Sequence, residues 1–204
     1  MANKFPFIKS VALILQTVWY LQLLFLFALI VVSLLIVIDS PVVDRYKLKG
    51  FRVQFQRIDL DKSVQNSTVY FSNGEARLHD KKTNDKFIFY RIFSVFVDAF
   101  LYTLIVLWLK KIFKSLETGN FFIRENGIYI KKIAYAVIGI SLLPPLIDYF
   151  INLQLVDALK IEGVIFKARL SFDFRSLFLA LLIFVIAKVF IKGAEIKEEN
   201  DLTI

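Results

Sequence analysis

Two aspartates are the residues whose placement most suggests chemistry. Asp98 lies in an otherwise uncharged, mostly apolar run between Arg91 and Lys110, and Asp148 follows a double proline in a second apolar run. A carboxylate inside a membrane-length apolar segment is costly to bury, and such residues often serve ion or proton pathways. Two interpretations stay open. The acids take part in proton or cation coupling, or both lie near enough to a membrane surface to stay hydrated.

The sequence contains few of the residues that other kinds of catalytic or metal site need. It has no Cys and one His, and His79 stands beside Asp80 in a polar stretch. Disulfides, thiolate metal sites and histidine-rich metal sites are therefore excluded. The seven Gly are scattered and form no phosphate-binding loop. The sequence predicts a protein that is not an enzyme and has no catalytic, metal or cofactor site.

The elements that position the two acids are long apolar segments. Of 204 residues, 57% are hydrophobic, and the mean hydropathy is +0.63. A bilayer needs about 20 apolar residues per helix. The first run is longer than the apolar region of a cleaved signal peptide, so it is interpreted as a true span. The sequence predicts an all-α membrane protein with one domain of four transmembrane helices, at about 11–38, 92–109, 128–152 and 174–192.

The two loops that would lie on one side of the membrane, residues 39–91 and 153–173, have strand patterns. Phe51, Val53 and Phe55 alternate with polar residues, and apolar residues alternate again from Val164 to Phe172. Asn73-Gly74 is a strong hairpin signal. We therefore expect a small extracytoplasmic β-subdomain formed by both loops, because three strands that share an apolar face can be stable.

Charge gives only a weak indication of orientation. An even number of spans places both termini on one side, and the short loops hold six Lys/Arg in residues 110–132 against four in 153–175. The expected arrangement is a multi-pass protein of the cell inner membrane, with cytoplasmic termini, a cytoplasmic connector at 110–127 and a cytoplasmic tail at 193–204. The net charge of +8 then favours contact with anionic lipid head groups over direct nucleic-acid binding.

The tail and the double proline each allow two interpretations. Gly193 is expected to end the last helix, after which several acids follow. This tail either folds back on the basic connector or docks a basic cytosolic partner. Pro144-Pro145 removes two backbone donors from the third span, which makes it either a gating hinge or a fixed bend. Lys188 is expected to mark the inner membrane boundary by extending its ammonium toward water.

Two stretches resemble a known family. The connector reads G-N-F-F-I-R-E-N, and the chain closes with F-I-K-G-A-E-I-K-E-E-N-D-L-T-I. Both resemble the bacterial integral membrane family catalogued as domain of unknown function 2975, whose members carry G-x-P-F-x-x-E-N before the third span and end in F-x-x-G-x-x-L-x-x-E-x-D-L-T-V. Asn120 stands where proline is usual, and Ile130-Lys131-Lys132 replaces the usual leucine-arginine pair. The matching residues are Gly119, Phe121 or Phe122, Glu125 and Asn126 in the connector, and Phe190, Gly193, Ala194, Glu195, Glu198 or Glu199, Asp201, Leu202 and Thr203 in the tail.

The resemblance implies a cytoplasmic C-terminus and pairing with a small helix-turn-helix transcription regulator. It favours a membrane sensor or regulatory partner, in which the tail residues dock the regulator. The alternative function is a small transporter or channel component that uses Asp98 and Asp148. Four spans are few for a transporter, so that alternative implies a homo-oligomer. The expected partners are the lipid bilayer, the cytosolic regulator and further copies of the chain.

Overall fold

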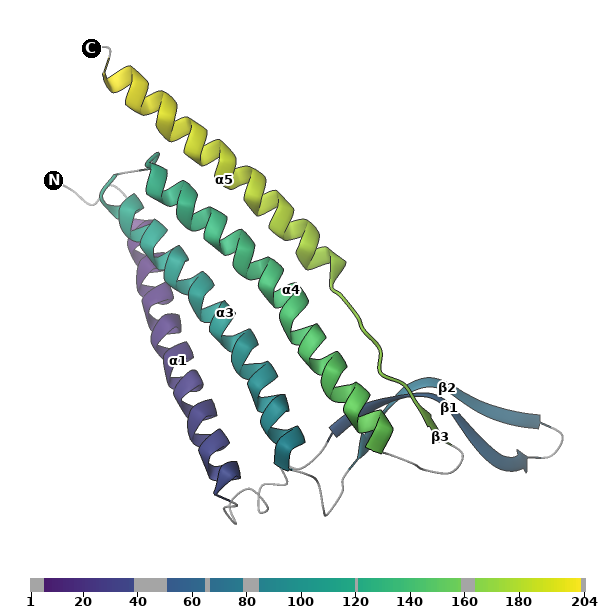
Figure 1. Ribbon diagram of the computed structural model, residues 1–204. Coiled ribbons are helices and arrows are strands. Elements are labelled where there is room, and N and C mark those ends of the chain that lie inside the picture. Colours follow the sequence, from purple (N-terminus) through teal and green to yellow (C-terminus); the bar gives the residue numbers. More distant parts are fainter. Residues whose placement is uncertain are drawn as a thin grey trace. The chain divides into compact units, whose positions relative to one another are not determined.

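The computed structural model describes residues 6–38, 51–64, 67–78, 85–119, 121–158 and 164–202. Figure 1 shows their arrangement as long helices and a small sheet. In chain order the elements are α1 (Pro6–Val37), β1 (Phe51–Val64), β2 (Ser67–Leu78), α3 (Asp85–Glu117), α4 (Arg124–Ala158), β3 (Val164–Phe166) and α5 (Phe174–Asp201).

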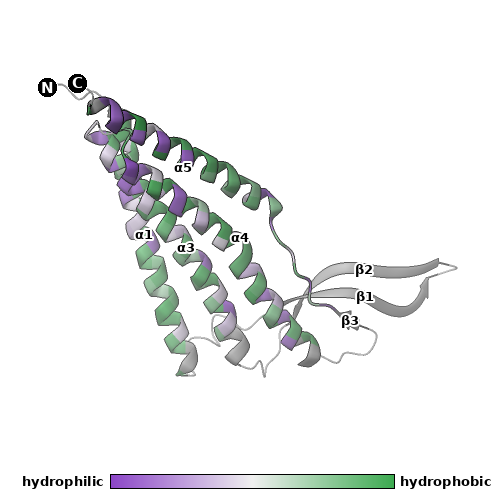
Figure 2. Cartoon of the chain, turned by 45° about the horizontal axis from the view of Figure 1, so that its top comes forward, coloured by the Kyte–Doolittle hydropathy of each residue, from purple (hydrophilic) through white to green (hydrophobic). Residues whose placement is uncertain are grey.

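Four of these helices are long and apolar enough to cross a membrane. The qualifying stretches are Phe7–Leu35, Phe89–Glu117, Arg124–Gln154 and Phe174–Asn200, so the four predicted spans are confirmed as helices. Within the most apolar 18 residues of each stretch, the rest of the chain buries only 6% of the first and 22% of the third. Hydrophobic residues cover the middle of the helices, and hydrophilic ones gather toward one end (Figure 2). The chain is therefore a multi-pass membrane protein with lipid-facing helices.

The chain divides into two compact units. The first contains residues 1–28, 96–143 and 172–204, and the second contains 29–95 and 144–171. The first unit thus holds most of α1, most of α3, the larger part of α4 and all of α5. The second holds the strands and the remaining parts of α1, α3 and α4. The division of α4 falls directly before Pro144.

The second unit contains a three-stranded sheet with the order β2-β1-β3. Both pairs are antiparallel, with Phe51 opposite Leu78 at one end of the β1–β2 ladder and Phe55 opposite Phe166 in the β1–β3 ladder. Strands from the two predicted loops therefore pair in one sheet. The apolar alternation predicted to Phe172 forms a strand only over Val164–Phe166.

The turn predicted at Asn73-Gly74 is wrong. Gly74 lies inside β2 and is paired with Phe55 of β1. The ladder extends to Val64 opposite Ser67, so β1 and β2 are joined through residues 65–66. Placing the connection there lets β1 pair along most of its length, and the pairing of two long strands outweighs a local turn preference.

The double proline lies within a continuous helix. Helix α4 runs from Arg124 to Ala158 with Pro144 and Pro145 inside it. Prolines occur in membrane helices because neighbouring groups can satisfy the freed backbone carbonyls. The choice between a gating hinge and a fixed bend stays open.

Helix α5 begins at a side-chain cap and passes through Gly193. Asp173 is the N-cap, and its Oδ1 accepts a hydrogen bond from the Arg175 backbone N–H at 3.1 Å. The prediction that Gly193 ends the helix is wrong, because α5 continues to Asp201. Good helix formers follow the glycine, and Lys192 pairs with Glu195 three residues later at 3.1 Å, which favours helix over tail.

Candidate functional site

The connector between α3 and α4 begins with a glycine-dependent reversal of the chain. Gly119 has a φ of 82°, and its N–H donates to the Leu116 carbonyl at 3.1 Å. The Thr118 hydroxyl donates to the Ser115 carbonyl at 2.7 Å. Nothing lies within 4 Å of a Cβ placed on Gly119. The glycine is therefore required for its left-handed backbone, as at many helix C-termini, and not for space.

Asn126 holds the connector in place. It is fully buried, although it stands at the start of α4. Its Oδ1 accepts a hydrogen bond from the Ser115 hydroxyl at 2.8 Å, and its Nδ2 donates to the Phe121 carbonyl at 3.2 Å. The side chain therefore joins the last turns of α3 to the connector. A buried amide is tolerated because its polar atoms are paired.

Phe122 of the connector contacts α5. The Phe122 and Phe190 rings stack with their centroids 5.6 Å apart and an interplanar angle of 29°. A Cβ on Gly193 would lie 3.4 Å from Phe122 Cδ1. The ring of Phe122 thus covers Phe190 and Gly193, one turn apart on α5. Two family-motif segments that lie about 70 residues apart in the sequence meet at this point.

Directly beside this contact, α4 and α5 approach through small residues. A Cβ on Gly127 would lie 2.5 Å from Ile191 Cγ1, 3.0 Å from Ile191 N and 3.3 Å from Ala187 O. Ala187 and Ala194 are almost fully buried. Small residues let helix backbones approach closely in membranes. The α4–α5 packing therefore fixes where the connector meets the last helix.

The terminal motif already included Ala194, whereas Gly127, Ala187 and Ser115 were missed in the sequence. Gly127 directly follows the motif residue Asn126, and Ser115 lies 11 residues before Asn126. A signal for the α5 contact was present, because Ala180, Ala187 and Ala194 recur every seven residues and each is no more than 1% exposed. Such a heptad of small residues indicates a helix–helix seam.

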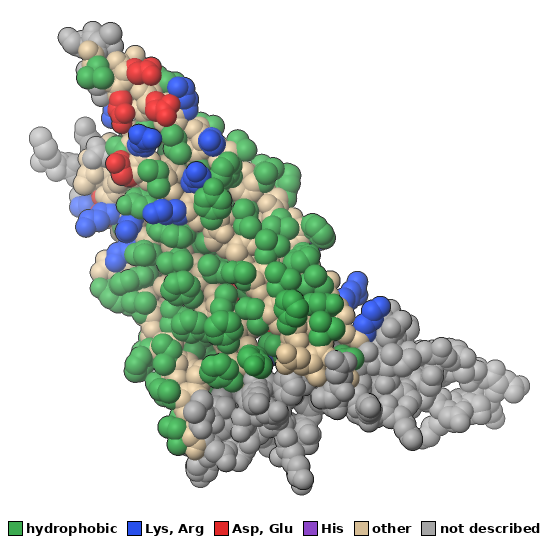
Figure 3. All heavy atoms as spheres, viewed as in Figure 1, with side chains coloured by type: hydrophobic (Ala, Val, Ile, Leu, Met, Phe, Trp, Pro, Cys, Tyr) green, Lys and Arg blue, Asp and Glu red, His purple; other side chains and the backbone are tan. Residues whose placement is uncertain are grey.

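The remaining tail residues lie on an exposed helical end. Glu198 and Glu199 are exposed, as are Ile196 and Leu202, and Asp201 is the last residue of α5. Glu195 pairs with Lys192. Figure 3 shows acidic side chains gathered at this end with basic ones beside them. Glu125, in the connector, is also exposed. The predicted tail residues thus divide into a packed pair, Phe190 and Gly193, and an exposed acidic helix end.

The two intramembrane acids fall in different compact units. Asp98 lies in α3, in the first unit, and is partly exposed. Asp148 lies in α4, in the second unit, where its Oδ1 is buried without a hydrogen-bond partner. Asn152 Oδ1, one turn later on α4, is buried in the same way. Among the described residues, no group of three His, Cys, Asp or Glu side chains could hold a metal ion.

Comparison with known proteins places this arrangement in a family. No curated protein and no solved structure matches the chain. A family model described as a protein of unknown function (DUF2975) matches residues 73–204. The matched region contains the connector, the packed residues of α5 and the acidic helix end. This confirms the resemblance seen in the two motifs, and the chain belongs to that family.

Proposed function

We propose that this protein is a membrane-embedded regulatory partner, whose connector and last helix together present a docking surface to a basic cytosolic protein. The observation that carries the proposal is the contact of Phe122 with Phe190 and Gly193. It joins the connector to α5 just before that helix becomes acidic. A helical end with exposed Glu198, Glu199 and Leu202 offers both charge and apolar surface to a partner.

The proposal includes the orientation of the chain. Both termini and the connector lie in the cytoplasm of a bacterial cell with the protein in its inner membrane, and the three-stranded sheet is an extracytoplasmic β-subdomain that senses a ligand or envelope state. The basic end of α3 and the start of α4 support this orientation, since Lys and Arg favour the cytoplasmic side. The proposed partner is a small helix-turn-helix regulator, and the role is not enzymatic.

A site-specific cross-linking experiment tests the docking surface. A photoreactive residue replaces Leu202, which is 88% exposed, in the full chain expressed in its own cell. The matched control carries the same residue in place of Phe7, which is 75% exposed on α1. We expect a DNA-binding protein to be captured from position 202 and not from position 7.

Charge reversal and transcription provide the second readout. Glu198→Lys with Glu199→Lys should abolish both the cross-link and any change in the transcription of the regulator's targets. Asp59→Lys with Asp61→Lys in β1 makes the same change in net charge outside the tail and the connector and should leave the cross-link intact. Unchanged transcription in the tail variant, with the protein still inserted, would refute the regulatory function.

A second candidate function is ion or proton transfer through an oligomer. Its supporting observation is the buried, unpartnered oxygen of Asp148 beside that of Asn152. Unpaired buried oxygens are rare and are candidates for binding a proton or cation. Proton flux into liposomes that contain the purified protein should then fall in Asp148→Asn. Flux that is absent from the wild type would remove this function.

A further inference from the structure

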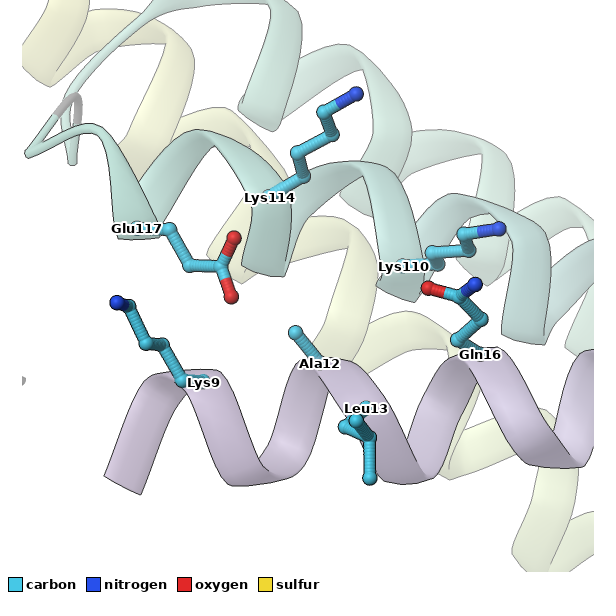
Figure 4. A pocket seen from close by; sticks show the side chains of 7 residues that line it. All are labelled: Lys9, Ala12, Leu13, Gln16, Lys110, Lys114 and Glu117. Atoms are coloured by element: carbon cyan, nitrogen blue, oxygen red, sulfur yellow. The ribbon is translucent and has the colours of Figure 1, made fainter. Parts of the chain in front are cut away.

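A groove opens between the first turns of α1 and the last turns of α3. Its volume is about 450 Å³, which is within the range of sites that hold small ligands. Figure 4 shows the two helices facing each other across it. All of its lining residues belong to the first compact unit. They are Lys9, Ala12, Leu13 and Gln16 from α1 and Lys110, Lys114 and Glu117 from α3.

The lining comes from one face of each helix. Lys9, Leu13 and Gln16 are spaced at three to four residues, and so are Lys110, Lys114 and Glu117, so each set forms a single stripe. Three lysines and one glutamate are the charged residues of the lining, and the Lys114 ammonium points away from α1 (Figure 4). In Figure 4 the Glu117 carboxylate points toward α1 on the side of Lys9, and Lys110 lies beside the Gln16 amide. The end of the groove near Lys110 is therefore positive and also offers an amide donor.

The Lys110 ammonium lies against two aromatic rings of α1. Lys110 Nζ lies 4.5 Å from the centroid of the Trp19 ring and 5.8 Å from that of Tyr20. A lysine placed over an indole is stabilised by the ring quadrupole. Trp and Tyr also favour the level of the lipid head groups in membrane proteins. This preference favours a head-group depth for the positive end of the groove.

Part of the α1 side of the groove is apolar and exposed to the surroundings. Leu13 is 70% exposed, and further exposed apolar side chains continue along α1, among them Leu24 at 65%. Acyl chains can lie against such a surface while a head group occupies the charged end. A soluble anion would gain the contacts with lysine but not this apolar surface.

We propose that this groove binds an anionic phospholipid, with the lipid phosphate at Lys110 and Gln16, the Lys114 side chain turned toward it, and an acyl chain along α1. The bound lipid contacts α1 and the last turns of α3. The proposal does not depend on the docking function, because it uses neither the Phe122 contact with α5 nor the acidic helix end.

Binding of a defined lipid to the full-length protein tests the proposal. The purified protein in mild detergent is titrated with phosphatidylglycerol and, separately, with phosphatidylcholine, and the bound lipid is counted by native mass spectrometry. We expect preferential binding of phosphatidylglycerol. Lys110→Gln with Lys114→Gln should weaken it roughly 30-fold, about fivefold for each lysine near an anionic lipid.

A charge-matched control separates the groove from general basicity. Lys131→Gln with Lys132→Gln removes two positive charges from α4, outside the groove, and should change the affinity less than about twofold. A further variant, Ala12→Phe, fills the groove without changing any charge and should also abolish the preference. It keeps the test decisive if the double lysine variant fails to fold.

Three results would overturn the proposal. Equal losses in the two double lysine variants would show only surface electrostatics. Unchanged binding in Ala12→Phe would show that the lipid lies elsewhere. Displacement of the lipid by millimolar inorganic phosphate would show that the groove binds a free anion and not a lipid.

Discussion

Replacing Gly127 by alanine tests whether α4 and α5 pack as closely as the structure shows. The added Cβ would lie 2.5 Å from Ile191 Cγ1, and rotation relieves this contact only at a cost, because a β-branched side chain in a helix strongly prefers one χ1 rotamer. The added Cβ would also lie 3.0 Å from Ile191 N and 3.3 Å from Ala187 O, and backbone atoms of a helix move only if the helix moves. The variant should therefore force the two helices apart.

The magnitude follows from two opposing effects. Overpacking at a close contact costs about 1–3 kcal/mol, whereas Gly→Ala inside a helix stabilises by about 1 kcal/mol. We expect a net loss of roughly 1 kcal/mol in the free energy of unfolding. For a chain of this size this corresponds to a midpoint about 2–4 °C lower, measured by circular dichroism of the purified protein in mild detergent.

Gly193→Ala is the matched control on the facing helix. Its new Cβ would meet only Phe122 Cδ1 at 3.4 Å and Cε1 at 3.7 Å, which are ordinary contacts. The gain in helix propensity should then dominate, and the variant should be as stable as the wild type or up to about 1 kcal/mol more stable. In the Gly127→Ala background, Ile191→Ala should recover only part of the loss, because the two backbone contacts remain. Gly127→Ala at or above wild-type stability would refute the close packing of α4 on α5.

Three further predictions use the same unfolding measurement. Asn126→Leu should destabilise the protein by about 1–3 kcal/mol, because it removes the hydrogen bonds that the fully buried Asn126 amide makes with Ser115 and Phe121. Asn200→Leu on the exposed end should change little, and equal effects would argue against a special role of Asn126. Gly119→Ala should cost about 1–2 kcal/mol through its left-handed backbone alone, and a neutral result would contradict the φ of 82°. The Ser176 hydroxyl donates to Asp173 and holds the pKa of that carboxylate below its ordinary value of 3.8, so its stabilising effect is complete above about pH 4 and is lost as the pH falls through the lowered pKa. The thermal unfolding midpoint of the wild type should therefore fall between pH 5 and about pH 2, and Asp173→Asn should lack this part of the decrease. An identical pH dependence of the midpoint in both proteins would refute the role of Asp173.

The spans were predictable because a membrane imposes a simple rule on sequence. A continuous apolar run of about 20 residues has few alternatives to a membrane helix. The ends of these helices were less predictable. Helix α5 was expected to stop at Gly193, because glycine often ends helices. In the structure this glycine instead makes room for Phe122, a contact with a segment that lies far away in the sequence.

The sheet illustrates the same limit. Alternation of apolar residues indicated strands in both loops, and strands from both loops are paired. The turn was misplaced, since Asn73-Gly74 has a strong local preference but lies opposite Phe55 in the ladder. Strand register depends on the pairing of two whole strands, and a two-residue turn signal alone does not determine it.

By itself, the sequence determined the number of spans, the family and the residues of its two motifs. Those properties depend on composition and on local order along the chain. Only the tertiary structure decided what the motif residues do. It brought Phe122 onto Phe190 and Gly193, and it buried Asn126 against Ser115. It also formed a groove from lysines of α1 and α3. Such contacts join residues that are distant in sequence, and their energies depend on how whole helices pack.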